Sequence, residues 1–130
     1  EAAKATGQFK MVVPLKVAGA YHSRLMQRAG DAFAKFLESV PISEPRVPVF
    51  SNVTGKRVTS ADEIRHNLGL QVTHPVRWEA DMREAGLLGL GGFIECGPGK
   101  ILAGLAKRID KSLNVASVSE WADIDPLPKS

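Results

Sequence analysis

The stretch GAYHSRLMQRAG, residues 19–30, places His22 where a glycine-containing loop gives way to an amphipathic run. A neutral imidazole, with an ordinary pKa of about 6.5, can act as a general base near neutral pH. Position alone does not distinguish such a base from a structural histidine. We interpret His66 and His74 as a solvated helix residue and a loop residue, too far from His22 in sequence for a local metal motif.

A histidine base needs a nucleophile, and no serine of this chain lies in the G-x-S-x-G turn that raises a hydroxyl above an α/β sheet. Cys96 is the single cysteine, and its neighbours in ECGPG supply no base or cation to activate a thiol. We therefore expect Cys96 to be a buried structural thiol. One cysteine forms neither an internal disulfide nor a zinc-binding pair, so we predict no metal site.

The sequence GPGK, residues 97–100, stands where a helix is expected to begin, and free amides and a lysine at such a position attract anions. A phosphate-binding loop of the G-x-x-x-x-G-K-S/T type would need a hydroxyl where Ile101 stands. We interpret GPGK as a structural turn, with an anion site as the alternative.

The elements that would position these residues alternate between strand and helix. Apolar residues recur with the helical period from residue 25 to residue 40, and SADE at 60–63 is a capping box that opens a helix fraying near Gly69. A further helix is predicted from Pro75, as its first residue, to a glycine cap at Gly86.

Strands are predicted at 47–55, at the start of 91–109 and at 114–118, and 9–18 is expected to be an edge strand or two short pieces because Pro14 interrupts it. The second half of 91–109 is a predicted helix. The tail 125–130 is expected to be irregular. Strands alternating with helices favour an α/β architecture with a mainly parallel sheet. One face of the helix in 91–109 carries four apolar residues, Ile101, Leu102, Leu105 and Ile109.

The composition of the 130-residue chain is that of a globular protein, with 44% hydrophobic residues and a net charge of +3 from dispersed lysines and arginines. With 6% aromatic residues it has few stacking platforms, so we predict no nucleic acid as a partner. No apolar run is long enough for a membrane span or a signal peptide, which predicts a soluble, cytoplasmic protein. Because EAAKATG at the start reads as the middle of a helix, we expect the polypeptide to begin upstream.

Four segments together resemble the C-terminal part of the malonyl-CoA:acyl carrier protein transacylases and the related acyltransferase domains of polyketide synthases. They cover nearly the whole chain, in the family's order and with comparable spacing. The segments are GAYHSRLM, VPVFSNVTG, QVTHPVRW and FIECGPGKILAGLAKRI.

The resemblance implies a catalytic role for His22, which would deprotonate a serine in a G-H-S-x-G elbow, while the main-chain carbonyl of Gln71 would hold the other ring nitrogen. The acyl-serine formed from malonyl-CoA would pass its malonyl group to the pantetheine thiol of acyl carrier protein, without a cofactor. Tyr21 would contact the substrate, since an aromatic residue before the histidine accompanies malonyl specificity in related domains.

The same resemblance implies an α/β-hydrolase-like large subdomain, ended by residues 19–130, and a ferredoxin-like small subdomain, closed by residues 1–18. The serine elbow, the arginine that pairs with the malonyl carboxylate and part of the oxyanion hole belong upstream of Glu1. We therefore expect a fragment of an S-malonyltransferase that is inactive alone and whose partner is the missing nucleophile-bearing segment. The alternative is a non-catalytic α/β module that docks a carrier protein.

Overall fold

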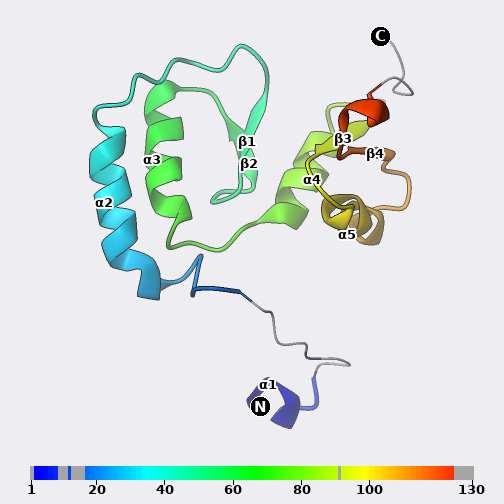
Figure 1. Ribbon diagram of the computed structural model, residues 1–130, viewed down its shortest axis with the longest axis horizontal. Coiled ribbons are helices and arrows are strands. Elements are labelled where there is room, and N and C mark those ends of the chain that lie inside the picture. The colour runs from blue at the N-terminus through cyan, green and yellow to red at the C-terminus, as the bar shows by residue number, and fades with distance from the viewer. Residues whose placement is uncertain (1, 9–11, 13–16, 91, 125–130) are drawn as a thin grey trace.

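A computed structural model describes residues 2–8, 12, 17–90 and 92–124 of the chain. In Figure 1 the paired helices α2 and α3 lie on one side, the short elements β3, α5 and β4 lie on the other, and α4 leads from one group to the other. The predictions for 9–18 and 125–130 fall largely outside the described residues. The short first helix is α1 (Ala2–Ala5).

The helix predicted between residues 25 and 40 begins with a 3₁₀ turn, η1 (Arg24–Met26), and continues as α2 (Gln27–Leu37). The Ser23 hydroxyl caps this start by accepting a hydrogen bond from the Leu25 amide at 3.3 Å. At the other end, the Arg65 guanidinium donates to the carbonyls of Leu37 and Val40. These bonds satisfy helix-end groups that would otherwise lack partners.

The next segment forms a hairpin of β1 (Val49–Ser51) and β2 (Lys56–Val58), which pair antiparallel with Val49 opposite Val58. The sequence predicts only the first of these strands. Gly55 has a φ of +68°, a left-handed conformation that glycine adopts without strain and that the turn requires. The described strands form one antiparallel pair and one parallel pair.

Helix α3 (Ala61–Gln71) starts at the predicted capping box. The Ser60 hydroxyl accepts from the Glu63 amide at 3.2 Å, but the Glu63 carboxylate accepts from the Thr59 amide, one residue earlier than a capping box predicts. The helix does not fray at Gly69. A side chain there would meet Ala34 of α2 at 3.3 Å, so the glycine allows the two helices to approach closely.

Helix α4 (Trp78–Gly86) begins three residues after Pro75, so the prediction of Pro75 as its first residue is wrong. The preceding segment is held instead by the hairpin, because the Arg77 amide donates to the Asn52 carbonyl at 2.7 Å. Gly86 is the last helical residue rather than a cap beyond the helix.

The last predicted strand, turn, helix and strand are all present, as β3 (Phe93–Cys96), α5 (Ile101–Ile109) and β4 (Val115–Val118), followed by the 3₁₀ turn η2 (Trp121–Asp123). Strands β3 and β4 pair in parallel through the crossover helix. This unit confirms the α/β class. The expectation of a buried Cys96 is wrong, because Cys96 is exposed at the end of β3.

Few large side chains are buried among the described residues; the buried apolar set is Leu37, Val58, Met82, Ala85, Ala103 and Ala106. The two buried residues of α5 are alanines, whereas Ile101 is 74% exposed and Leu102 and Leu105 are also exposed. The predicted apolar face of α5 is thus mostly uncovered in this chain. No helix in the described part of the chain is both long enough and apolar enough to cross a membrane.

Candidate functional site

His22 stands in the loop before η1 with a φ of +60°, the one positive value at a non-glycine residue in the described part of the chain. The left-handed region is uncommon for residues with a side chain, although histidine enters it more often than most. Its main-chain amide donates a hydrogen bond to the Val72 carbonyl at 3.1 Å. Val72 is the C-cap residue of α3, so the end of that helix fixes the backbone of His22.

The imidazole is held by the same helix end, because His22 Nδ1 lies 2.9 Å from the main-chain oxygen of Gln71. The contact expected between this ring and this carbonyl is therefore present. A carbonyl oxygen can only accept, so Nδ1 carries the hydrogen and donates it. In the neutral ring the lone pair then resides on Nε2.

The Gln71 side chain supports this arrangement without competing for the ring. Its Nε2 lies 3.4 Å from His22 Nδ1, but both atoms are donors in the tautomer fixed by the carbonyl. The same amide donates to the His74 carbonyl at 3.3 Å, which is an acceptor it can use. We therefore assign the hydrogen bond of Nδ1 to the Gln71 carbonyl.

The residues beside His22 differ in how they are used. The Ser23 hydroxyl donates to the Ala20 carbonyl at 2.7 Å while it caps η1, so this nearest serine is a structural residue rather than a nucleophile. Tyr21 is 57% exposed, and a Cβ on Gly19 would lie 3.4 Å from its ring. Tyr21 thus folds back over the loop, while Leu25 is itself 73% exposed.

His22 is exposed, as expected for a base that must reach a substrate. The neighbouring cavity, of about 170 Å³ between the hairpin and α3, is lined by Gln71 and by Asn67 but not by His22. An exposed imidazole with a fixed tautomer can accept a proton from a group brought to Nε2. Within the described residues no cluster of three or more histidine, cysteine or acidic side chains is arranged to hold a metal ion.

The amides at the start of α5 are already occupied. The Glu95 carboxylate accepts from the Leu102 amide at 2.9 Å and from the Ala103 amide at 3.0 Å, and it also accepts from the Ser117 hydroxyl at 3.1 Å. These bonds, above all that from Leu102, hold the pKa of the Glu95 carboxyl below its ordinary value. GPGK is therefore a structural turn, with a side chain of the chain itself in the place of a bound anion.

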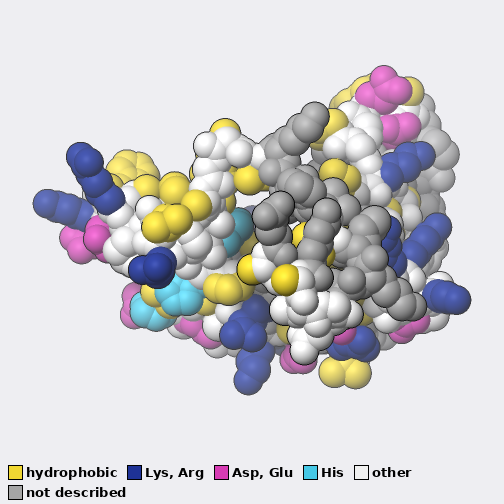
Figure 2. Space-filling model, turned by 90° about the horizontal axis from the view of Figure 1, so that it is seen from below, with side chains coloured by type: hydrophobic (Ala, Val, Ile, Leu, Met, Phe, Trp, Pro, Cys, Tyr) yellow, Lys and Arg dark blue, Asp and Glu magenta, His cyan; other side chains and the backbone are white. Residues whose placement is uncertain are grey.

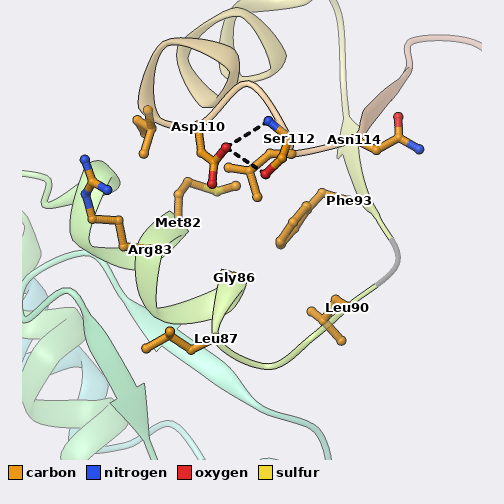
Figure 3. A pocket seen from close by; sticks show the side chains of 11 residues that line it. Met82, Arg83, Gly86, Leu87, Leu90, Phe93, Asp110, Ser112 and Asn114 are labelled. Carbon is orange, nitrogen blue, oxygen red and sulfur yellow. Dashed lines mark hydrogen bonds between the residues drawn. The ribbon is translucent and has the colours of Figure 1, made fainter.

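A cavity of about 540 Å³ lies between the last turn of α4 and the loop that follows α5 (Figure 3). Its charged side chains have partners within the chain. Asp110 accepts from the amide and the hydroxyl of Ser112 at 2.8 and 2.7 Å, and Arg83 pairs with Glu79 at 2.8 Å. This cavity therefore presents no uncommitted charge to a ligand. Around the rim of the face in Figure 2, basic and acidic side chains are interspersed, and no continuous basic surface is visible there.

Asp81 is the residue to which sequence analysis gave no role. An aspartate in a helix reads as solvated, yet Asp81 is 6% exposed and neither carboxylate oxygen has a hydrogen-bond partner in the described part of the chain. Burial raises the pKa of its carboxyl above the ordinary value. Nothing in the local sequence signals this burial, which comes from the packing of α4 against the β1–β2 hairpin.

Comparison with known proteins finds relatives of this chain among the malonyl CoA-acyl carrier protein transacylases. A malonyl CoA-acyl carrier protein transacylase of Synechocystis is 36% identical over 127 residues, which are 98% of this chain and 43% of that protein. The resemblance seen in the sequence is confirmed. No protein-family model matches the chain.

Solved transacylases have the same fold over this region. The acyl-carrier-protein S-malonyltransferase of Burkholderia pseudomallei superposes with a TM-score of 0.86 at 35% identity, covering 95% of this chain and 40% of the transferase. A malonyl-transacylase in complex with a type II polyketide synthase acyl-carrier protein superposes with a TM-score of 0.86 at 38% identity. The match covers 94% of this chain and 40% of that transacylase. The chain spans about two fifths of the length of these transacylases.

Proposed function

We propose that this chain is the histidine-bearing part of a malonyl-CoA:acyl carrier protein S-malonyltransferase. The hydrogen bond from His22 Nδ1 to the Gln71 carbonyl carries the proposal, because it leaves Nε2 as the free basic atom on an exposed ring. The similarity to transacylases supplies the class of reaction. The nucleophilic serine belongs to a segment outside the 130 residues.

In the first half-reaction the serine Oγ attacks the malonyl thioester carbon while His22 Nε2 takes the hydroxyl proton. Collapse of the tetrahedral intermediate breaks the carbon–sulfur bond, and the imidazolium returns the proton to the coenzyme A thiolate. In the second half-reaction the pantetheine thiol of the carrier protein loses its proton to the same nitrogen and attacks the acyl-serine. The serine oxygen then recovers the proton, and malonyl-pantetheine leaves.

Gln71 acts in both halves as the residue that positions His22. Its carbonyl keeps the hydrogen on Nδ1 and becomes a charge-assisted acceptor when the ring is protonated. In serine hydrolases a carboxylate performs this task, whereas here a main-chain group at the end of α3 performs it. The same proposal assigns residues 1–18 to the end of a ferredoxin-like small subdomain and residues 19–130 to the end of the large subdomain.

Tyr21 is proposed to limit the acyl group. It precedes the base directly and is largely exposed, so its ring is available to crowd the carbon between the two carbonyls of malonyl. An extra methyl group on that carbon would then be disfavoured. The competing interpretation is packing of Tyr21 on η1 at Leu25, where both side chains remain exposed.

The proposal is tested by comparing the 130-residue chain with the complete polypeptide encoded upstream of Glu1. Incubated with malonyl-CoA, the chain alone is expected to give no adduct by mass spectrometry, while the complete polypeptide gains one malonyl group on serine and passes it to carrier protein. A stoichiometric adduct on the 130-residue chain would contradict the missing nucleophile and reopen Cys96. A start codon in place of an upstream G-H-S-x-G elbow would favour the non-catalytic module.

A further inference from the structure

His74 follows the end of α3, the same helix end that holds His22. Its Nδ1 lies 2.9 Å from the main-chain oxygen of Leu70 and also 2.9 Å from Thr73 Oγ1. A carbonyl oxygen can only accept, so Nδ1 carries the hydrogen and shares it between these two oxygens. The sequence predicts only a loop residue here, whereas the structure shows a ring bonded back to the last turn of a helix.

Two main-chain groups of His74 take part in the same closure. Its amide donates to the Leu70 carbonyl at 3.0 Å, and its carbonyl accepts from the Gln71 side-chain amide at 3.3 Å. The last carbonyls of a helix have no partner within the helix and depend on such bonds. Pro75 adds a constraint, because a residue before proline avoids the helical conformation. His74 thus ends the helix and closes its last turn.

Thr73 fixes this turn to the neighbouring helix. Its hydroxyl donates to the Leu70 carbonyl at 3.2 Å. Its methyl group lies 3.0 Å from where a Cβ on Gly30 would stand, and Gly30 is a buried residue of α2. The ring of His74 is therefore bonded to a residue that is itself packed against α2.

The carbonyls of Gln71 and Val72 lie between two fixed points. Leu70 precedes this pair in the chain, and His74 follows it. Each residue has only two soft backbone dihedrals, so bonds on both sides leave the intervening peptide units little freedom. The pair accepts hydrogen bonds from the ring and the backbone of His22. We propose that His74, by closing this turn, is a positioning residue for His22 and touches neither the substrate nor the reacting atoms.

This inference rests on the proposed function, because it concerns the orientation of the base in acyl transfer. In the complete polypeptide, His74→Ala removes the ring donor and should lower kcat for malonyl transfer by about 10-fold, as for other residues that orient a functional histidine through a further bond. The KM for malonyl-CoA should stay unchanged, because one base serves both half-reactions and both slow together.

Two matched variants separate the lost hydrogen bond from the loss of the ring. His74→Asn keeps a donor, because the side-chain amide nitrogen of asparagine can take the place of Nδ1, and it should restore most of the rate. His66→Ala removes an exposed histidine from α3 and should transfer at the unmodified rate. If His74→Asn were as slow as His74→Ala, the donor would not be the group that matters, and the inference would be wrong.

Nitrogen-15 NMR of the His22 ring gives a readout that a purely structural role of His74 would not change. In the unmodified complete polypeptide and in His74→Asn, the neutral ring should carry its hydrogen on Nδ1. In His74→Ala the Nε2–H tautomer should become populated, because the Gln71 carbonyl is no longer held in place. An unchanged tautomer in His74→Ala would overturn the inference.

The tautomer also separates this inference from the proposed function, because it depends on the hydrogen bonding of His22 and not on the upstream serine. If the unmodified complete polypeptide transferred no malonyl group, the proposed function would fail. A change of tautomer in His74→Ala would still support the positioning of His22 by His74.

Discussion

Two helix ends hold two side chains in opposite ways. At the carboxyl end of α3 the carbonyls of Gln71 and Val72 accept hydrogen bonds from the ring and the backbone of His22. At the amino end of α5 the amides of Leu102 and Ala103 donate to Glu95. Both arrangements use main-chain groups that a helix leaves unpaired.

The difference lies in what remains free. Glu95 commits both carboxylate oxygens to amides of α5 and to the Ser117 hydroxyl, so each oxygen already has a partner within the chain. His22 commits one ring nitrogen and keeps the other, on an exposed ring and with a left-handed backbone. A residue that accepts an unfavourable conformation and retains an unused reactive atom is a candidate for chemistry, whereas a fully bonded one is a structural cap.

The largest effect is expected from removing His22 Nε2, the ring nitrogen without a partner among the described residues. In the complete polypeptide, His22→Ala should lower the rate of malonyl transfer by about 10²- to 10⁴-fold, because a positioned base typically contributes that much. Steady-state transfer from malonyl-CoA to carrier protein measures it. His66→Ala, an exposed histidine on α3, is the control and should transfer at the unmodified rate. Near-normal turnover of the His22 variant would mean that the residue held at the end of α3 is structural, like Glu95 at the start of α5.

The next effect concerns Tyr21, which precedes His22, and the choice of acyl group. If Tyr21 crowds the acyl group, malonyl-CoA should be preferred over methylmalonyl-CoA by about 10- to 200-fold, the range for excluding one methyl group from a pocket. Tyr21→Ser should narrow this ratio. Competition between the two thioesters before and after the substitution measures it, and an unchanged ratio would place specificity on another segment.

A smaller effect compares packing at two glycines, Gly55 in the turn of the hairpin and Gly104 in α5. Gly55→Ala forces a side chain into a left-handed backbone with its Cβ 2.5 Å from that of Ala80, so we expect a loss of about 1 to 3 kcal/mol in the free energy of unfolding. Gly104 of α5 faces open space, with no atom within 4 Å of where a Cβ would stand, and Gly104→Ala should add about 0.5 to 1 kcal/mol. Urea unfolding measures the change in the free energy of unfolding for both variants. Changes of the same sign would contradict the proposed difference in packing.

The smallest effect is the pH dependence of the Glu95 cap. Its pKa in the folded chain lies below the ordinary value of 4.5, so the unfolded state binds more protons in that interval. The cap therefore stabilises fully above the ordinary value, and its contribution disappears as pH falls through the lowered pKa. Glu95→Gln should flatten the decline of the urea midpoint between neutral and acid pH. An unaltered acid slope would show that the amides of α5 do not depend on this carboxylate.

Local hydrogen bonding explains what could be predicted from the sequence. The hydroxyl of Ser60 finds the third residue after it by chain geometry alone, so the start of α3 was predictable. The strand, glycine turn and helix around GPGK follow from equally local signals. The contact of His22 with Gln71 joins residues far apart in sequence, and only the resemblance to a family indicated it.

Tertiary packing explains what could not be predicted from the sequence. Strand β2 forms because its partner β1 is adjacent, although KRV carries little strand signal of its own. The periodicity of α5 correctly predicts a helix. However, the residues of this helix that are buried are Ala103 and Ala106, whereas Ile101 is exposed. Asp81 shows the same limit, since its environment is set by residues from β1 and β3 that local sequence does not reveal.

The left-handed backbone of His22 also governs which replacements are informative at that position. Asparagine and glycine enter this region readily, while β-branched residues resist it. An asparagine there would retain the loop trajectory and remove the proton acceptor, so it isolates chemistry from conformation. Valine or isoleucine would disturb both, and their loss of function would say little about catalysis. The shape of the main chain thus selects asparagine as the replacement that removes the base and leaves the backbone of the loop in place.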